Sequence, residues 1–341
     1  MGMKRIIILL IAMLFIGTVS IAGSVLYISN MVTRPLTIEH DTFFTIEKGS
    51  NAYRIVKQLR NNGVTQVSPF IAKVWLKFFA GNTSVKSGTY LLSPSLSLVD
   101  AFTVFTQGEE HLFAVSLVEG LTLSQWLETL QGHGEITFDI DEQSLSDTTS
   151  SNGVDWCCDE VEHYEGLYLA DTYFFTKGTH ASDILRRAHR ALVNFTAEAW
   201  RNRALELPLT TPYEALILAS IIEKETAVPA EREQIAGVFV NRLNNNMRLQ
   251  TDPTVIYGIG ADFDGNITRK HLRTATPYNT YVIKGLPPTP IAMAGKEAIV
   301  AALMPEQTDA LYFVAKGDGT HQFSTTLEAH NAAVRKYQLN R

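Results

Sequence analysis

Cysteine is scarce in this sequence: its 341 residues include two, Cys157 and Cys158, and they are adjacent. A disulfide framework joins cysteines that are well separated along the chain, so this pair does not staple a fold. We expect two thiols in a loop, and a strained vicinal disulfide is the alternative.

The motifs of several common enzyme classes are also missing. There is no HExxH pattern, and His321 and His330 have no third partner at metal-ligand spacing, so no metal site is predicted. The glycines of GIGADFDG (258–265) precede no helix of the phosphate-binding kind and are predicted to form a turn. No GxSxG elbow occurs, and no cofactor is implied.

Positive charge is in short supply, with 29 basic against 35 acidic residues and a formal net charge of -6. Such a chain has no electrostatic footprint for a nucleic-acid backbone, so nucleic acid is excluded as a partner. With 45% hydrophobic and 19% charged residues, the composition predicts a folded protein with at least one large core. The length favours two domains.

One long apolar run stands at the N-terminal end. The segment Ile6–Ile28 carries no charge and is long enough to cross a hydrocarbon core of about 30 Å, whereas a signal sequence has only about 7 to 15 apolar residues. We predict a single transmembrane helix over residues 6–28. Lys4 and Arg5 place residues 1–5 in the cytoplasm and the rest of the chain on the outer side. Cleavage near Ala22 and Gly23 is the alternative.

The remaining chain is predicted to be α+β. Residues 29–41 are interpreted as a polar linker, and residues 42–108 as a small α/β subdomain with strands over 42–46 and 86–92 and helices over 52–60, 69–79 and 98–107. Residues 109–341 form a larger α+β domain. Its most polar part, 137–165, lacks the ligand spacing of a calcium loop and is interpreted as a solvated surface insertion.

A helix with a well-marked start is the most informative segment. It reads TPYEALILASIIEKET, in which Thr211 can cap the helix, Pro212 takes the first helical position and Glu214 completes a capping box. At 100° per residue, Glu223 continues the apolar stripe of Leu216 and Ala219.

Loss of solvation at the apolar face would raise the pKa of Glu223, as a general acid requires. The structural alternative is that Glu223 pairs with Arg232 or Arg242. Glu225 is expected to point to the opposite side of the helix, into solvent.

A second helix is predicted over Pro229–Asn245, where Arg242 interrupts the apolar face and either reaches the Glu223 cleft or snorkels to the surface. Two predicted loops follow, RLQTDPTVIYG (248–258) and TPYNTYVIKGLPPTPIA (276–292). They mix aromatic and polar side chains as sugar-binding sites do. The candidates for binding sugar are Gln250, Asp252, Tyr257, Tyr278, Asn279 and Tyr281.

Several segments, in order, closely resemble the YceG-like family of endolytic murein transglycosylases. They are EGLYLADTYFF, ASIIEKETAVPAEREQIAGVFVNRL, MRLQTDPTVIYGIG, TPYNTYVIKGLPPTPIA and YFVAKGDGTHQFSTTLEAHN, and they cover roughly half of the chain. The last segment adds His321 to the candidates for substrate binding, beside Arg242. FTIEKGSNAYRIVKQL, at the start of the small subdomain, resembles the opening of a LysM unit.

The resemblance implies an enzyme of the bacterial inner membrane with a periplasmic catalytic domain. It would cut the bond between N-acetylmuramic acid and N-acetylglucosamine within nascent glycan strands, leave 1,6-anhydro ends and so terminate strand elongation. The family's catalytic glutamate falls on Glu223, which would act first as acid and then as base. Peptidoglycan strands are the implied substrate. Penicillin-binding proteins and other wall-synthesis proteins are partners implied by the resemblance alone.

Two alternatives are open. If Asp252 or Glu225 projects into the same cleft as Glu223, a water molecule could be activated and the protein would be a lysozyme-like hydrolase. The other alternative is a non-catalytic scaffold that only holds glycan strands.

Overall fold

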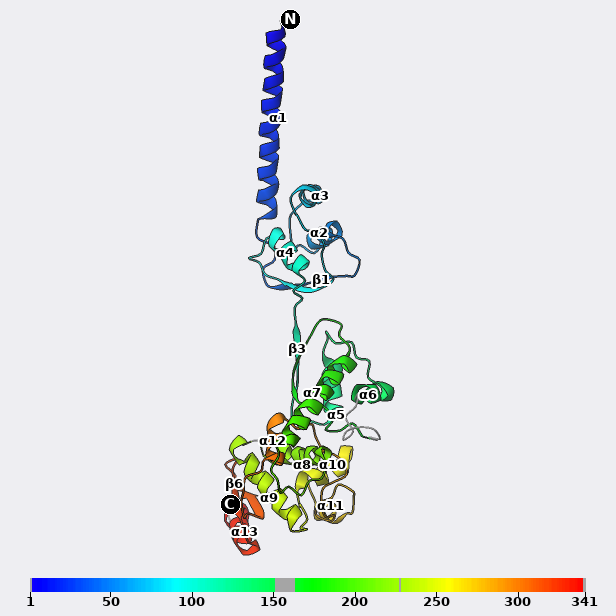
Figure 1. Ribbon diagram of the computed structural model, residues 1–341, viewed down its shortest axis with the longest axis vertical. Helices are drawn as coiled ribbons and strands as arrows, with labels where there is room; N and C mark the ends of the chain where they lie inside the picture. Colours follow the sequence, from blue (N-terminus) through cyan, green and yellow to red (C-terminus); the bar gives the residue numbers. More distant parts are fainter. Residues whose placement is uncertain (1, 151–162, 227, 340–341) are drawn as a thin grey trace. The chain divides into compact units, whose positions relative to one another are not determined.

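The computed structural model describes residues 2–150, 163–226 and 228–339, and the chain divides into two compact units, Met1–Phe113 and Ala114–Arg341 (Figure 1). Cys157 and Cys158 lie outside the described residues. In the described residues, helices combine with three two-stranded sheets, which confirms the predicted α+β class.

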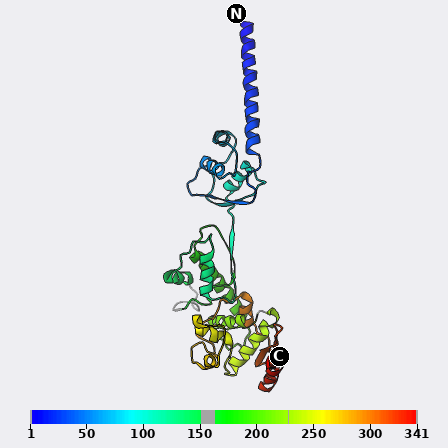
Figure 2. The same cartoon turned by 180° about the vertical axis from the view of Figure 1, so that it is seen from behind.

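The first unit begins with helix α1, Met3–Val32, which is apolar and long enough to cross a membrane (Figures 1 and 2). Its last turn belongs to the core of the unit, because Val32 is buried there and Ile28 packs against it. The segment predicted as a linker is therefore partly helical and held in place. The Leu36 N–H donates to Leu96 O at 2.8 Å and the Thr37 N–H to Val64 O at 2.9 Å.

The rest of the first unit has the predicted succession of elements. Strand β1 pairs antiparallel with β2, and helices pack against the face that carries Phe44 and Tyr90. Asn51, Ser68 and Ser97 cap the three helices through their side chains. The assignment as a LysM-like unit stays a prediction. The elements are β1 Thr42–Ile46, α2 Ala52–Asn61, α3 Pro69–Phe78, β2 Gly88–Leu92 and α4 Leu98–Gln107.

The second unit is mainly helical and has two small sheets, in which β3 pairs with β4 and β5 pairs antiparallel with β6. Its elements are β3 Phe113–Leu117, α5 Leu123–Gly132, α6 Glu142–Thr149, β4 Asp171–Phe175, α7 Ala181–Arg201, α8 Pro212–Glu225, η1 Pro229–Glu231, α9 Arg232–Asn244, α10 Asp252–Ile259, η2 Gly260–Asp262, α11 Arg269–Arg273, α12 Lys296–Leu303, β5 Tyr312–Ala315, β6 His321–Ser324, α13 Leu327–Val334 and η3 Arg335–Leu339.

Helix α8 is the central helix of this unit and packs against α7, α9 and α12. The predicted capping box is confirmed: the Glu214 N–H donates to the Thr211 hydroxyl at 3.2 Å, and the Glu214 carboxylate accepts the Thr211 N–H at 3.4 Å. Every residue from Ala215 to Ile222 is buried. A helix that is apolar on all sides lies inside a protein, so α8 has no wet face along this stretch.

Two expectations for this unit need correction. The predicted loop 248–258 contains most of helix α10, because Asp252 and Pro253 stand at positions that favour a helix start. The polar segment 137–165 is not wholly a solvated insertion, because it includes helix α6 and ends at the buried Glu165. The second predicted loop, 276–292, contains neither helix nor strand.

Candidate active site

The last turn of α8 carries two glutamates that face different pockets. Glu223 lines one pocket and Glu225 lines another, as expected for side chains about 200° apart around a helix. Because α8 is surrounded by protein, both sides of this turn meet other elements of the unit.

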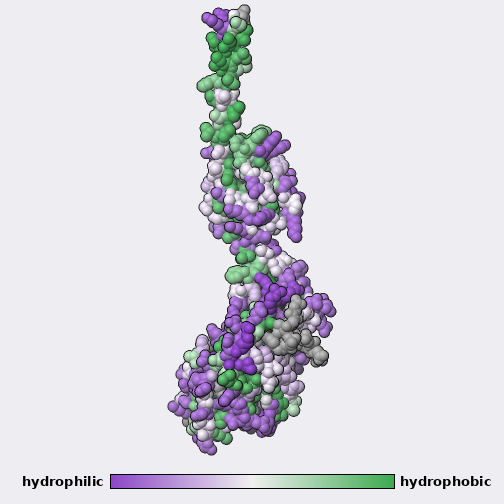
Figure 3. Space-filling model, viewed as in Figure 1, coloured by the Kyte–Doolittle hydropathy of each residue, from purple (hydrophilic) through white to green (hydrophobic). Residues whose placement is uncertain are grey.

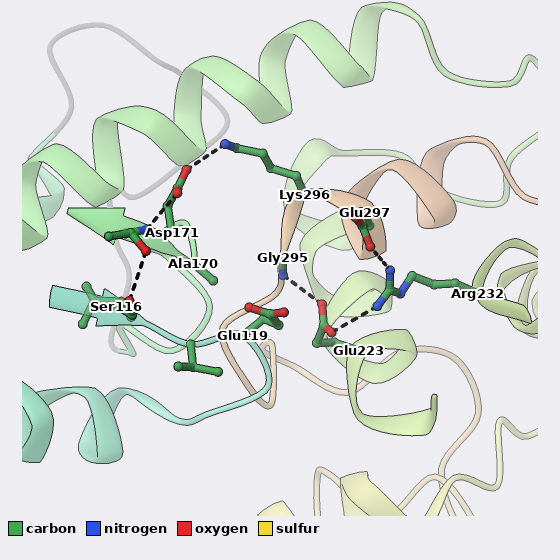
Figure 4. Close-up of a pocket in the computed structure, with 12 residues that line it drawn as sticks. Ser116, Glu119, Ala170, Asp171, Glu223, Arg232, Gly295, Lys296 and Glu297 are labelled. Atoms are coloured by element: carbon green, nitrogen blue, oxygen red, sulfur yellow. Dashed lines mark hydrogen bonds and ion pairs between the residues drawn. The ribbon is translucent and has the colours of Figure 1, made fainter. Parts of the chain in front are cut away.

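The Glu223 pocket lies where α8, α12 and the β3–β4 sheet meet (Figure 4). It has a volume of about 340 Å³, and charged side chains and backbone form much of its wall. Figure 4 shows Glu223 directed toward Gly295 and Arg232, with Glu119 nearby. The lining residues are 116–119, 170–172, 223, 232 and 295–297.

Both carboxylate oxygens of Glu223 are engaged by the protein. Oε2 accepts the Gly295 N–H at 2.9 Å, and Oε1 lies 3.8 Å from Nη2 of Arg232, which also pairs with Glu297. Burial raises the pKa of Glu223, and the Gly295 N–H and Arg232 oppose that rise. The pairing with Arg232 is the structural alternative considered for this residue.

The prediction that Glu225 is exposed to solvent is wrong. The residue is half-buried, and its carboxylate accepts a hydrogen bond from the hydroxyl of Thr251, at the start of α10. Burial raises the pKa of Glu225 above its ordinary value, and the nearby carboxylate of Asp252 adds to the rise. His321 and Arg242 act in the opposite direction.

The Glu225 pocket has a volume of about 570 Å³ and brings together most of the residues predicted to bind sugar. Its wall combines polar groups with the rings of Tyr281, Tyr312 and Phe313, the mixture that carbohydrate sites use. The predicted residues that line this pocket are Gln250, Asp252, Tyr281, Arg242 and His321, and none of them lines the Glu223 pocket.

Arg242 fixes one wall of the Glu225 pocket. It is buried, with 7% of its surface exposed, and donates to backbone oxygens of Leu249 at 2.7 Å and Leu311 at 2.6 Å. Its guanidinium carbon also lies 5.2 Å from the centre of the Tyr312 ring. Arg242 therefore joins α9 to the β5–β6 hairpin and neither snorkels nor reaches Glu223.

Two polar pairs complete this pocket. Nδ1 of His321 lies 2.7 Å from a carboxylate oxygen of Glu231, whose other oxygen accepts the His321 N–H at 2.9 Å. The hydroxyl of Tyr281 donates to Asp252 at 2.7 Å. These contacts fix the orientation of the His321 and Tyr281 side chains in the pocket wall.

The other predicted residues have structural partners. Asn279 is buried and donates to the carbonyl oxygens of His271 at 3.0 Å and Thr274 at 2.7 Å, so it holds its loop together. The hydroxyl of Tyr278 is 2.9 Å from that of Thr289. Tyr257 packs on Tyr278, with ring centroids 4.9 Å apart, and lines neither of the two pockets.

Sequence reasoning missed Glu165, although it opens the quoted segment EGLYLADTYFF. Only 8% of its surface is exposed, and burial raises the pKa of Glu165 to about 7. The carboxylate accepts the Leu123 N–H at 3.0 Å and the Tyr257 hydroxyl at 3.5 Å. The apolar residues that follow Glu165 in the sequence were a signal of its burial, but the polar segment before it suggested solvent exposure.

A carboxyl group with a raised pKa, enclosed beside aromatic rings and polar side chains, can donate a proton to a bound sugar and take one back. Glu225 meets these conditions, whereas Glu223 faces a smaller pocket and is held by Gly295 and Arg232. Among the residues that the structure describes, no three His, Cys, Asp or Glu side chains are grouped so that they could hold a metal ion.

Comparison with known proteins gives consistent matches over most of the chain. An endolytic murein transglycosylase of Bacillus subtilis is 31% identical over 93% of this chain and 91% of its own length. One from Streptococcus pneumoniae is 26% identical over 86% of this chain and 57% of its own length. The crystal structure of a yceG-like protein from Listeria monocytogenes, 30% identical, superposes with a TM-score of 0.53 and covers 86% of this chain and 99% of that one. Residues 44–336 match the YceG-like family, and the chain belongs to that family.

Proposed function

We propose that this protein is a peptidoglycan lytic transglycosylase and that Glu225 is its catalytic acid and base. The observation that carries the proposal is the Glu225 pocket, which joins a buried carboxyl of raised pKa to five residues chosen from sequence as sugar ligands. The names of the relatives supply the substrate class, murein, and the endolytic mode of cleavage.

The proposed reaction needs one carboxyl group. Glu225 gives its proton to the glycosidic oxygen between N-acetylmuramic acid and N-acetylglucosamine as the bond from that oxygen to the anomeric carbon breaks. The 6-hydroxyl of the same muramic acid then attacks the anomeric carbon and returns its proton to Glu225. No water is consumed, the strand ends in a 1,6-anhydro sugar, and the acid is regenerated.

Glu223 was the residue predicted from sequence, and it is the alternative to Glu225 as the catalytic residue. Its contacts with Gly295 and Arg232 favour a structural function in which it ties the end of α8 to α9 and to the start of α12.

A hydrolase is the second candidate, because Asp252 lines the same pocket as Glu225 and raises its pKa. Two carboxylates that flank a glycosidic bond can activate water, as in lysozyme-like enzymes. Under this alternative Asp252 would position the water, and the product would carry a reducing end.

Mass spectrometry of the cleaved strands separates the two reactions. We expect anhydro ends from the native protein and from Asp252→Asn, because a transglycosylase needs no second carboxylate. Reducing ends, or a complete loss of cleavage by Asp252→Asn with binding retained, would instead favour the hydrolase. Unchanged cleavage by Glu225→Gln would remove Glu225 from the mechanism and leave Glu223 as the candidate, whereas absence of cleavage by the native protein would favour the scaffold alternative.

We further propose that α1 anchors the protein in the cell inner membrane, with its N-terminus in the cytoplasm and the second unit in the periplasm. The apolar composition of α1 and the basic Lys4 and Arg5 support this orientation. There the enzyme would cut nascent strands beside penicillin-binding proteins and end their elongation. Loss of strand binding on removal of residues 42–108 would support glycan binding by the LysM-like unit.

A further inference from the structure

The first unit exposes an unusual set of side chains on helix α3. Phe70 is 77% exposed, Phe78 66% and Phe79, directly after the helix, 49%. Lys73 and Lys77 are exposed between the phenylalanines, and Nζ of Lys77 lies 5.2 Å from the centre of the Phe78 ring. Grouped exposed aromatic residues usually mark an interaction surface.

The four of these residues that belong to α3 share one side of the helix. At 100° per residue, Phe70, Lys73, Lys77 and Phe78 fall within about 140° of the helix circumference. The opposite side carries Ala72 and Trp75, which are buried in the core of the unit. The arrangement of phenylalanines with lysines, above a buried face, is that of a helix that lies in a membrane interface. We call the set Phe70, Lys73, Lys77 and Phe78 the α3 face.

The position of the α3 face within the first unit identifies what it meets. Helix α3 contacts α1 and lies beside its C-terminal part (Figures 1 and 2). Hydrophobic surface is visible in Figure 3 where α1 joins the unit. The apolar run of α1 ends at Ile28, and Val32, one turn or about 6 Å further along the helix, is already in the core. No slack separates the membrane span from the unit.

The charge distribution selects an anionic surface. Residues 48–99 contain seven basic residues and no acidic residue, in a chain whose formal net charge is -6. Lys and Arg close to a membrane are attracted to anionic lipid headgroups, and their apolar stems can lie against the acyl boundary. A purely apolar partner would provide no negative charge to pair with these basic residues.

We propose that the α3 face rests on the outer surface of the bilayer that α1 spans, with its phenylalanines among the headgroups and its lysines paired with anionic phospholipid. The proposal rests on α1 as the membrane anchor and concerns no part of the catalytic pocket. It holds the first unit flat against the membrane, so that α1 is not its sole attachment.

The test uses the full chain in vesicles of phosphatidylcholine with phosphatidylglycerol. In a Cys157→Ser, Cys158→Ser background, a fluorescent label is attached at Phe78→Cys, at Thr45→Cys and at Phe15→Cys. Thr45 is exposed on the strand face opposite the helices, so it is the matched control, and Phe15 lies in the middle of α1. Nitroxide lipids then report which labels touch the bilayer.

We expect a shallow nitroxide to quench most of the fluorescence at position 78 and little at position 45, and a deep nitroxide to quench position 15. Lys73→Gln with Lys77→Gln should reduce quenching at position 78 in anionic vesicles, whereas Lys48→Gln should not. Equal, weak quenching at positions 78 and 45, with position 15 quenched, would overturn the proposal and leave the anchor intact. A change at position 78 on addition of glycan strands, without quenching by lipid, would also overturn it. Absence of quenching at position 15 would overturn the anchor as well.

Discussion

The two sides of the last turn of α8 carry chemically similar groups in different surroundings. Glu223 and Glu225 are both carboxyl groups whose pKa is raised by burial. Glu223 is held by Arg232 and the Gly295 N–H in a small charged pocket, whereas Glu225 lies in a larger pocket with aromatic rings. A raised pKa therefore does not identify a catalytic acid, and the groups around the carboxyl must also be able to bind a substrate.

The largest expected effect separates the two glutamates directly. Glu225→Gln keeps the shape of the side chain but cannot transfer a proton, so strand cleavage should fall by about 10²- to 10⁴-fold. Glu223→Gln should keep most of the activity, because Gln can still accept the Gly295 N–H. Release of soluble fragments from purified peptidoglycan measures both. The reverse ranking would restore Glu223 as the catalytic residue.

The pH dependence of cleavage gives a further test of the same assignment. Glu225 must be protonated to act as the acid, and its pKa is raised, so kcat/KM should decline as pH rises through a value above the ordinary glutamate range. Glu223→Gln should leave that decline in place. If the decline shifts or disappears in Glu223→Gln, the group that titrates would be Glu223 and not Glu225.

A third carboxyl group with a raised pKa, Glu165, gives a test of how such a group changes stability. Its pKa is about 7 in the folded chain against an ordinary 4.5, so the folded state holds a proton that the unfolded state has released. The unfolding free energy should therefore fall by about 3 kcal/mol as pH rises from about 4.5 to about 7. Glu165→Gln has no proton to lose and should lack this dependence. Thermal unfolding at several pH values measures it, and parallel curves for the two proteins would contradict the prediction.

Substitutions around Glu223 should change the stability of the protein more than its catalytic activity. Arg232→Met removes the cation nearest to Glu223 and should lower the unfolding free energy by about 2 kcal/mol, because a buried carboxylate loses its partner. Glu297→Gln breaks the other pair of Arg232, but the Glu297 side chain is 76% exposed, so the loss should stay below about 1 kcal/mol. Denaturant unfolding measures the free energy of unfolding of both variants. Equal decreases in the two would mean that the burial of Glu223 does not determine the loss of stability.

A small effect on activity is expected at the wall of the Glu225 pocket. Tyr281→Phe removes the hydroxyl that donates to Asp252 but keeps the ring, which should cost about 1 kcal/mol, or roughly five-fold in kcat/KM. Tyr278→Phe is the matched control, because its hydroxyl pairs with Thr289 and does not line the pocket. Equal losses in the two variants would show that the pocket is not where substrate binds.

Local sequence signals predicted many of the elements because their causes are local. The capping box of α8 and the side-chain caps of α2, α3 and α4 stand in the sequence beside the helices they start. The helical wheel failed at Glu225 for a physical reason. It assumes one dry and one wet side, and α8 is buried all round, so a residue opposite the apolar stripe also meets protein.

The composition of the pocket was partly predictable. Polar and aromatic residues in the segments 248–258 and 276–292 indicated sugar binding, but the helical wheel and the family resemblance both pointed to Glu223 as the catalytic residue. The contributions of Tyr312 and Glu231 to this pocket could not be predicted from neighbouring residues. They depend on the β5–β6 hairpin, which is distant in sequence and places His321 in the pocket that Glu225 lines. Asn279 was predicted to bind sugar, but its side chain donates to backbone carbonyl oxygens and stabilises its own loop.

The Glu225 pocket is lined in part by the β5–β6 hairpin, which begins 87 residues after the end of α8, and this order has a consequence for biosynthesis. Ribosomes make α1 first, the glutamates of α8 later, and Tyr312 and His321 later still. If α1 is the membrane anchor, a chain still under synthesis can thus be tethered while the Glu225 pocket lacks a wall. Under the proposed function, the chain would reach the membrane before the Glu225 pocket is complete.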